Sequence, residues 1–113
     1  MAVLVSDDVL IPIGFEQLTP TASTALAGAT KVHNGRTLTA NRALVTCTTQ
    51  DVRWRDDGYD HDTATYTGTV PTASVGVQLK ADNDMFYNGD LLAIRFIEET
   101  SGAILNVAYY YAK

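Results

Sequence analysis

The sequence predicts an all-β protein: a single antiparallel β-sandwich, jelly-roll-like, with seven or eight short strands. In several short runs apolar residues recur at every second position, which is the period of a β-strand. Turn signals such as Asp57-Gly58 and Ser101-Gly102 bound these runs. No segment carries the apolar spacing of an amphipathic helix. A turn after roughly every ten residues is typical of jelly-roll or immunoglobulin-like sandwiches, and we expect the jelly-roll-like form.

The chain of 113 residues has the length and the 46% hydrophobic content of one globular domain. It contains no internal repeat and no linker. We expect residues 1–16 to form an N-terminal arm or edge strand, and residues 17–113 to form the sandwich domain. Within that domain, residues 59–70 are expected to form an inserted loop.

The first strand is expected in the run "VLIPIGFEQL", where Val9, Ile11, Ile13 and Phe15 fall on one face. Pro12 lacks an amide donor, which favours an edge strand or an extended arm that adds a strand to a neighbouring protein. Downstream, the Thr- and Ala-rich stretch predicts a short strand or loop. The Asn34-Gly35 pair predicts a turn that is followed by another short strand.

Later runs show clearer alternation. "ALVTCTT" predicts a strand with Ala43, Val45 and Cys47 on one face, and Cys47 is expected to be a small buried residue. In "SVGVQLKA", Gly76 predicts a bulge. The remaining inward positions expected in later strands are Val52, Trp54, Leu92, Ile94, Phe96, Leu105, Val107 and Tyr109.

Charge and cysteine content exclude several classes of function. Eight Lys and Arg against 13 Asp and Glu give a net charge of −5, which disfavours nucleic-acid and membrane-surface partners. No apolar run approaches the ~20 residues of a membrane span. The N-terminus lacks the basic segment of a signal peptide, so we expect synthesis and assembly in a cytoplasm. The single cysteine allows no intrachain disulfide.

The stretch "RWRDDGYDHDTATYTGTVPTAS" places four aspartates beside His61 and suggests a metal site or acid–base pair. The carboxylates do not follow EF-hand spacing, and three Cys and His residues are too few for a closed zinc site. A Ser74, His61 and Asp57 triad lacks any framing motif. We therefore expect no enzyme, no cofactor and no metal, and interpret the aspartates as those of a solvated loop; a hard cation held by Asp60 and Asp62 is the alternative.

Several residues are candidates for a protein interface. Arg53 and Arg55 share one strand face, which predicts either ion pairs on a solvent face or a protein-binding stripe. Exposed tyrosines are typical of protein interfaces and of sugar-binding platforms. The full candidate set is Leu10, Ile11, Ile13, Phe15, Arg53, Arg55, Tyr59, Tyr66 and Tyr110.

The strings "ALVTCTTQDVRWRDDG", "PTASVGVQL" and "GDLLAIRFIEETSGAILNVAYYY" resemble a family of short tailed-bacteriophage virion proteins. "IGFEQLT" and "STALAG" resemble the opening of the same family. Its members run from the DDG turn almost directly to the Pro-Thr-Ala segment, so Tyr59 to Val70 is an insertion here.

This resemblance implies a virion structural protein, most plausibly a capsid decoration (cement) protein on the outer head surface. Its partners would be the major capsid protein or other virion proteins, and it would form a homo-oligomer such as a trimer. The alternative is a carbohydrate-binding module on the head or tail that uses the Tyr and Asp residues of the loop.

Overall fold

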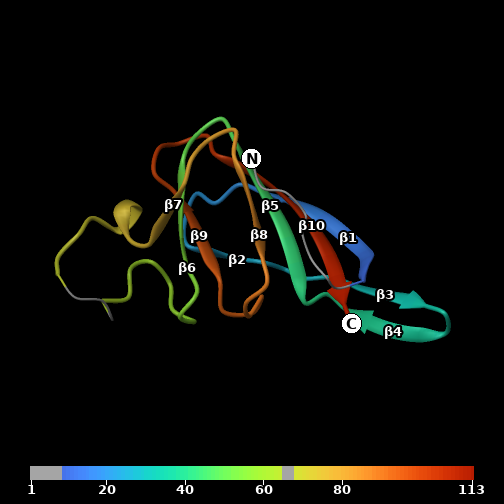
Figure 1. Ribbon diagram of the computed structural model, residues 1–113. Coiled ribbons are helices and arrows are strands. Elements are labelled where there is room, and N and C mark those ends of the chain that lie inside the picture. Colours follow the sequence, from blue (N-terminus) through green and yellow to red (C-terminus); the bar gives the residue numbers. More distant parts are fainter. Residues whose placement is uncertain (1–8, 65–67) are drawn as a thin grey trace.

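The computed structural model describes residues 9–64 and 68–113, and they form two antiparallel four-stranded sheets packed as a sandwich (Figure 1). This confirms the predicted all-β sandwich. Sheet A has the order β1 (Leu10–Leu18), β10 (Ile104–Ala112), β5 (Arg42–Thr48) and β8 (Asp84–Tyr87). Sheet B has the order β2 (Thr24–Ala25), β9 (Arg95–Glu98), β6 (Val52–Arg55) and β7 (Val77–Leu79).

The strand order is that of a jelly roll. Among the eight sandwich strands, the first pairs with the last, the second with the seventh, the third with the sixth and the fourth with the fifth. This is one long hairpin rolled into two sheets. The β6–β7 connection is the tip of that hairpin, so it can lengthen without disturbing any strand pair. The insertion expected at residues 59–70 lies in this connection, together with the short 3-10 helix η1 (Thr72–Ser74).

A separate hairpin of β3 (Thr30–His33) and β4 (Arg36–Thr39) extends beyond the sandwich. Asn34 and Gly35 join its strands with φ angles of 51° and 75°, as a two-residue turn that follows strand twist requires. The hairpin and the β6–β7 connection project at opposite ends of the molecule (Figure 1), whose extents are 48 × 27 × 23 Å.

The predicted inward faces are largely confirmed. The residues of β5 and β10 expected in the core are fully buried: Ala43, Val45, Cys47, Leu105, Val107 and Tyr109. Ile94 and Phe96 are buried as well, and Trp54 packs partly buried against the core. The prediction for Leu92 is wrong: β9 begins only at Arg95, and Leu92 lies in the preceding turn with 83% of its surface exposed.

Strand β1 contains a β-bulge that overturns the prediction that Phe15 shares one face with Ile11 and Ile13. The register with β10 shifts between Pro12 and Gly14, so Ile13 is an extra residue. One extra residue reverses which side chains point inward. Ile11 and Ile13 are therefore core residues, whereas Phe15 points outward and is 87% exposed.

The expected domain boundary at residue 16 falls inside β1, which is an edge strand of sheet A. Residues 10–16 pair with β10 and belong to the sandwich, so they are not a free arm. Residues 1–8, the rest of the expected arm, lie outside the described residues.

Gly76 precedes β7 at a point of close backbone approach. Its φ is +99°, and a Cβ there would lie 2.2 Å from the carbonyl oxygen of Trp54. Only glycine fits both the left-handed conformation and this contact with β6. Gly58 has a similar φ of +86°, but its Cβ would meet nothing within 4 Å.

We expect Gly76→Ala to lower the free energy of unfolding by ~3 kcal/mol, because strain and a backbone clash combine. Gly58→Ala is the matched control and should cost only ~1 kcal/mol, from the positive φ alone. Denaturant unfolding of both variants measures the difference. Equal losses would contradict the close β6–β7 contact.

Candidate functional site

The outer face of sheet A carries a row of apolar side chains across all four strands. Phe15 of β1 pairs with Ala108 of β10, Ala108 with Leu44 of β5, and Leu44 with Phe86 of β8. Their chain neighbours in β5 and β10 are buried in the core, so these four point away from it. We call Phe15, Ala108, Leu44 and Phe86 the apolar row.

Polar residues flank the apolar row on both sides. One flank contains Pro12, Tyr110 and Arg42. The other flank contains Gln17, Asn106, Thr46 and Asp84. A hollow of about 470 Å³ lies over β1, β10 and β5, with Phe15 and Leu44 among its lining residues. A face with an apolar row, two phenylalanines and few charges has the composition of a protein interface core.

The structure brings only some predicted interface residues to this face. Phe15 and half-buried Tyr110 lie on it. Ile11 and Ile13 are each 8% exposed and face the core, and Leu10 is half-buried at the start of β1. The row residues that the sequence analysis missed are Leu44, Phe86 and Ala108. Leu44 and Ala108 had a signal in their outward positions in predicted strands, whereas β8, the strand that contains Phe86, was not predicted.

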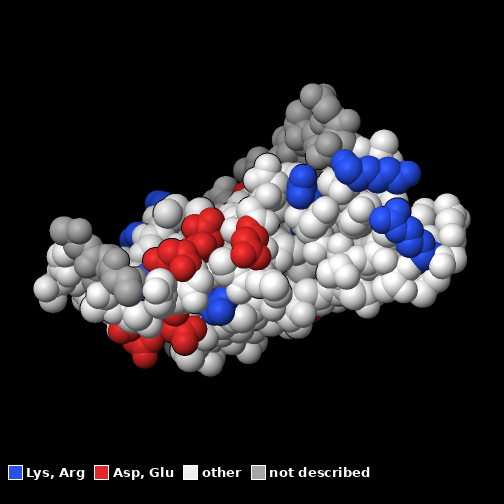
Figure 2. Space-filling view, turned by 90° about the horizontal axis from the view of Figure 1, so that it is seen from below, with Lys and Arg blue, Asp and Glu red and all other residues white. Residues whose placement is uncertain are grey.

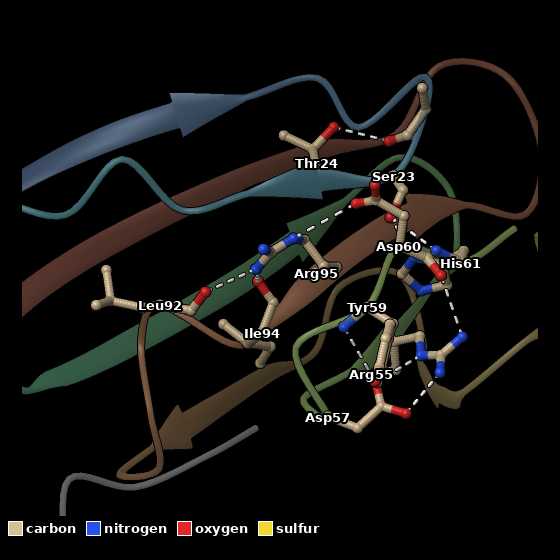
Figure 3. Close-up of polar contacts among 11 residues, drawn as sticks. Ser23, Thr24, Arg55, Asp57, Tyr59, Asp60, His61, Leu92, Ile94 and Arg95 are labelled. Carbon is tan, nitrogen blue, oxygen red and sulfur yellow. Dashed lines mark hydrogen bonds and ion pairs between the residues drawn. The ribbon is translucent and has the colours of Figure 1, made fainter. Parts of the chain in front are cut away.

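Arg55 is buried at the base of the β6–β7 connection, so its predicted exposure on the strand face is wrong. Its Nε and Nη2 donate to the carboxylate of Asp57 at 2.7 and 2.5 Å (Figure 3). Its Nη1 donates to the backbone carbonyl oxygens of Asp60 and Thr63 at 3.1 and 2.9 Å. Arg55 therefore holds the start of the loop in one conformation, and this contact lowers the pKa of Asp57.

His61 is a buried anchor of the same loop, with none of its surface exposed. Its backbone N–H donates to the Ser23 hydroxyl at 3.0 Å, and its Nδ1 lies 2.8 Å from that hydroxyl (Figure 3). The serine can then donate to Nδ1. Burial lowers the pKa of His61 below its ordinary value, so the ring is neutral at pH 7. The interpretation of this stretch as only a solvated loop is wrong for His61.

The geometry of these residues does not make a catalytic triad. His61 meets Ser23 rather than Ser74, and its buried Nε2 has no hydrogen-bond partner. A serine nucleophile needs a histidine that a third group orients through its other ring nitrogen. Asp57 is held by Arg55 instead. Within residues 9–64 and 68–113, no three His, Cys, Asp or Glu side chains are placed to hold a metal ion.

Arg53 and Tyr59 lie away from the apolar row. Arg53 forms an ion pair with Glu99 through Nε at 2.6 Å, which confirms the ion-pair interpretation for this residue. Tyr59 is 49% exposed, and its ring centroid lies 5.9 Å from the Arg55 guanidinium, within cation–π range. Tyr66 lies outside the described residues.

The ends of the molecule differ in charge. Figure 2 shows Lys and Arg gathered at the end that carries the β3–β4 hairpin, and Asp and Glu gathered toward the other end. Lys31 and Arg36 belong to the hairpin. Aspartates 56, 57, 60 and 62 follow β6. Sheet A runs between these two ends, and the paired strands of its outer face contribute two charged residues, Arg42 and Asp84.

We expect His61 to make stability depend on pH. The unfolded ring takes up a proton near its ordinary pKa of 6.5, whereas the folded ring has a lower pKa. Stability contributed by the neutral ring is therefore lost as the pH falls below the ordinary pKa of 6.5. In His61→Asn, the free energy of unfolding should depend less on pH across this window. Denaturant unfolding at several pH values tests this. If the free energy of unfolding changes equally with pH in both proteins, a buried neutral His61 is contradicted.

Comparisons with family models, with curated proteins and with solved structures find no match to this chain. Among the described residues, no helix has the length and apolar character needed to cross a membrane. The functional proposal therefore rests on the arrangement of residues in the structure. The surface that this arrangement indicates is the outer face of sheet A.

Proposed function

We propose that this protein is a structural component of a bacteriophage virion, a capsid decoration protein that binds the outer head surface. It stabilises the head through contacts with the major capsid protein or other virion proteins. The observation that carries this proposal is the apolar row, with Phe15 87% exposed at its edge. A contiguous apolar patch on a small protein is typical of a contact surface.

The fold and the charge of the chain support this role. Jelly rolls serve in viral capsids and in lectins, so the fold alone does not choose between these functions. A net charge of −5 suits the outer surface of a DNA-filled shell, because it would be repelled on the DNA side. The resemblance of the strand motifs to short phage virion proteins favours the capsid role. Assembly would take place in the host cytoplasm.

We expect phage heads that lack this protein to release DNA at a lower temperature than complete heads. Adding back the purified protein should restore the release temperature. Phe15→Ser should restore it less, because the edge of the contact surface is lost, whereas Leu92→Ser, equally exposed but outside sheet A, should act like the original protein. A thermal release assay with quantification of bound protein provides the measurement. Heads equally stable with and without the protein would contradict the decoration role.

Carbohydrate binding is the second candidate function. A hollow of about 370 Å³ beside the β6–β7 connection is lined by Asp60 and Asp62 and by the hydroxyl-bearing residues Thr21, Ser23 and Thr72. Carboxylates and hydroxyls are suitable partners for sugar hydroxyls. Tyr59 packs beside Arg55 and does not line this hollow, so the described residues supply no aromatic platform there.

A glycan array with and without calcium tests this second function. If the hollow binds sugars, we expect selective signals that Asp62→Ala lowers at least tenfold, a loss of ~1.4 kcal/mol. Asp82→Ala, at an exposed aspartate outside the hollow, is the matched control. No signal for any glycan would exclude the carbohydrate function and leave the decoration role unaffected.

A further inference from the structure

We propose that the outer face of sheet A binds a second copy of this chain, with a two-fold axis that runs along the apolar row. The inference deepens the proposed function by naming the partner of that face. It rests on the proposed function in one respect only, that the face is a protein contact surface. An isologous contact of this kind requires a surface that is complementary to itself. Shape, charge and size each bear on that requirement.

The shape of the row suits a copy of itself. Phe15 projects from β1 beside Ala108, the smallest side chain of the row, and the hollow of about 470 Å³ lies between Phe15 and Leu44. In a face-to-face pair, sheets lie ~10 Å apart and their side chains interdigitate. A two-fold axis along the row places the Phe15 rings of the two copies against each other, and the hollow beside Ala108 leaves room for the rings to stack with an offset.

The two charges that flank the row are placed for self-complementarity. Arg42 precedes Leu44 by two residues on β5, whereas Asp84 is level with Thr46, two residues beyond Leu44. The charges therefore lie on opposite sides of the row, on adjacent strands. A two-fold axis along the row brings Arg42 of each copy to the side where the other copy has Asp84. One symmetry operation therefore brings opposite charges near each other at two equivalent places, in addition to the interactions that Arg42 and Asp84 make within their own chain.

This charge balance distinguishes the face from the rest of the molecule. Among the described residues of its paired strands, the face carries one arginine and one aspartate and so no net charge, on a chain whose net charge is −5. Two copies would meet there with less repulsion than at the acidic end. Pairing through the open edge of β1 is disfavoured, because Pro12 and the bulge interrupt that edge.

The size of the face fits a small dimer. Strands spaced ~4.8 Å apart and rising ~3.3 Å per residue make a four-stranded face roughly 19 Å wide and up to 30 Å long. Specific interfaces bury about 800 Å² of accessible surface on each partner. The projected area of this face is somewhat smaller, and protruding side chains such as Phe15 add to it.

Sedimentation equilibrium of the full chain over a range of concentrations tests the proposal. We expect a monomer–dimer equilibrium whose dissociation constant rises at least tenfold in Phe15→Ser. The fold should survive, because this side chain is 87% exposed. Leu92→Ser, at a similarly exposed side chain outside sheet A, should leave the constant unchanged.

A charge-reversal cycle tests the orientation of the two-fold axis. Arg42→Asp and Asp84→Arg should each weaken dimerisation roughly tenfold, because like charges then face each other. The double variant should recover to within a few-fold of the original constant. Circular dichroism melting of each variant separates loss of association from loss of fold. Failure of the double variant to recover, with the fold intact, would overturn this orientation.

A chain that stays monomeric at every concentration up to its solubility limit would overturn the inference. The outcome for the proposed function is separate, because binding to heads is measured independently. A monomer whose binding to heads is weakened by Phe15→Ser would show that the shell, rather than a second copy, covers the face. A dimer that binds no heads would keep this inference and contradict the decoration role.

Discussion

One extra residue in the edge strand β1 determines which surface this protein presents. Ile13 forms a bulge against β10, so the side-chain pattern of β1 changes phase between Ile11 and Phe15. Without the bulge, Phe15 would point into the core and Glu16 into solvent. With it, Phe15 completes an apolar row across sheet A, and the proposed contact surface follows from this local irregularity.

A half-buried polar network supports the outward orientation of Phe15 in β1. The Tyr109 hydroxyl donates to Glu16 Oε1, and the same oxygen accepts from the Ala27 N–H at 2.9 Å. The Gly28 N–H donates to the Tyr109 hydroxyl at 3.1 Å. Burial raises the pKa of Tyr109, so the phenol remains a donor. Because turning Glu16 outward would leave these groups unpaired, the network keeps Phe15 exposed.

Alternation in the sequence predicted the sandwich and most of its core, since β5 and β10 keep a strict period of two. It could not predict the bulge, because Ile13 is apolar and fits either phase of the strand. Phe15 was therefore placed on the same face as Ile11 and Ile13, among the interface candidates. The burial of His61 was missed because it depends on Ser23, which lies far away in the chain. The burial of Arg55 was missed because it depends on how the following loop folds back over its side chain. The alternation within one strand can be read from the sequence. The apolar row also depends on how four strands align with one another, which alternation within a single strand does not reveal.

The central claim is that the outward phase of Phe15 creates a surface that a second copy covers. Isotope-filtered nuclear Overhauser spectroscopy on a mixture of labelled and unlabelled protein tests it most directly. Cross-peaks between the Phe15 ring of one copy and the Ala108 methyl group of the other are the expected result. Intermolecular cross-peaks confined to Leu92 or the β3–β4 hairpin, or none at concentrations where the protein is dimeric, would contradict it.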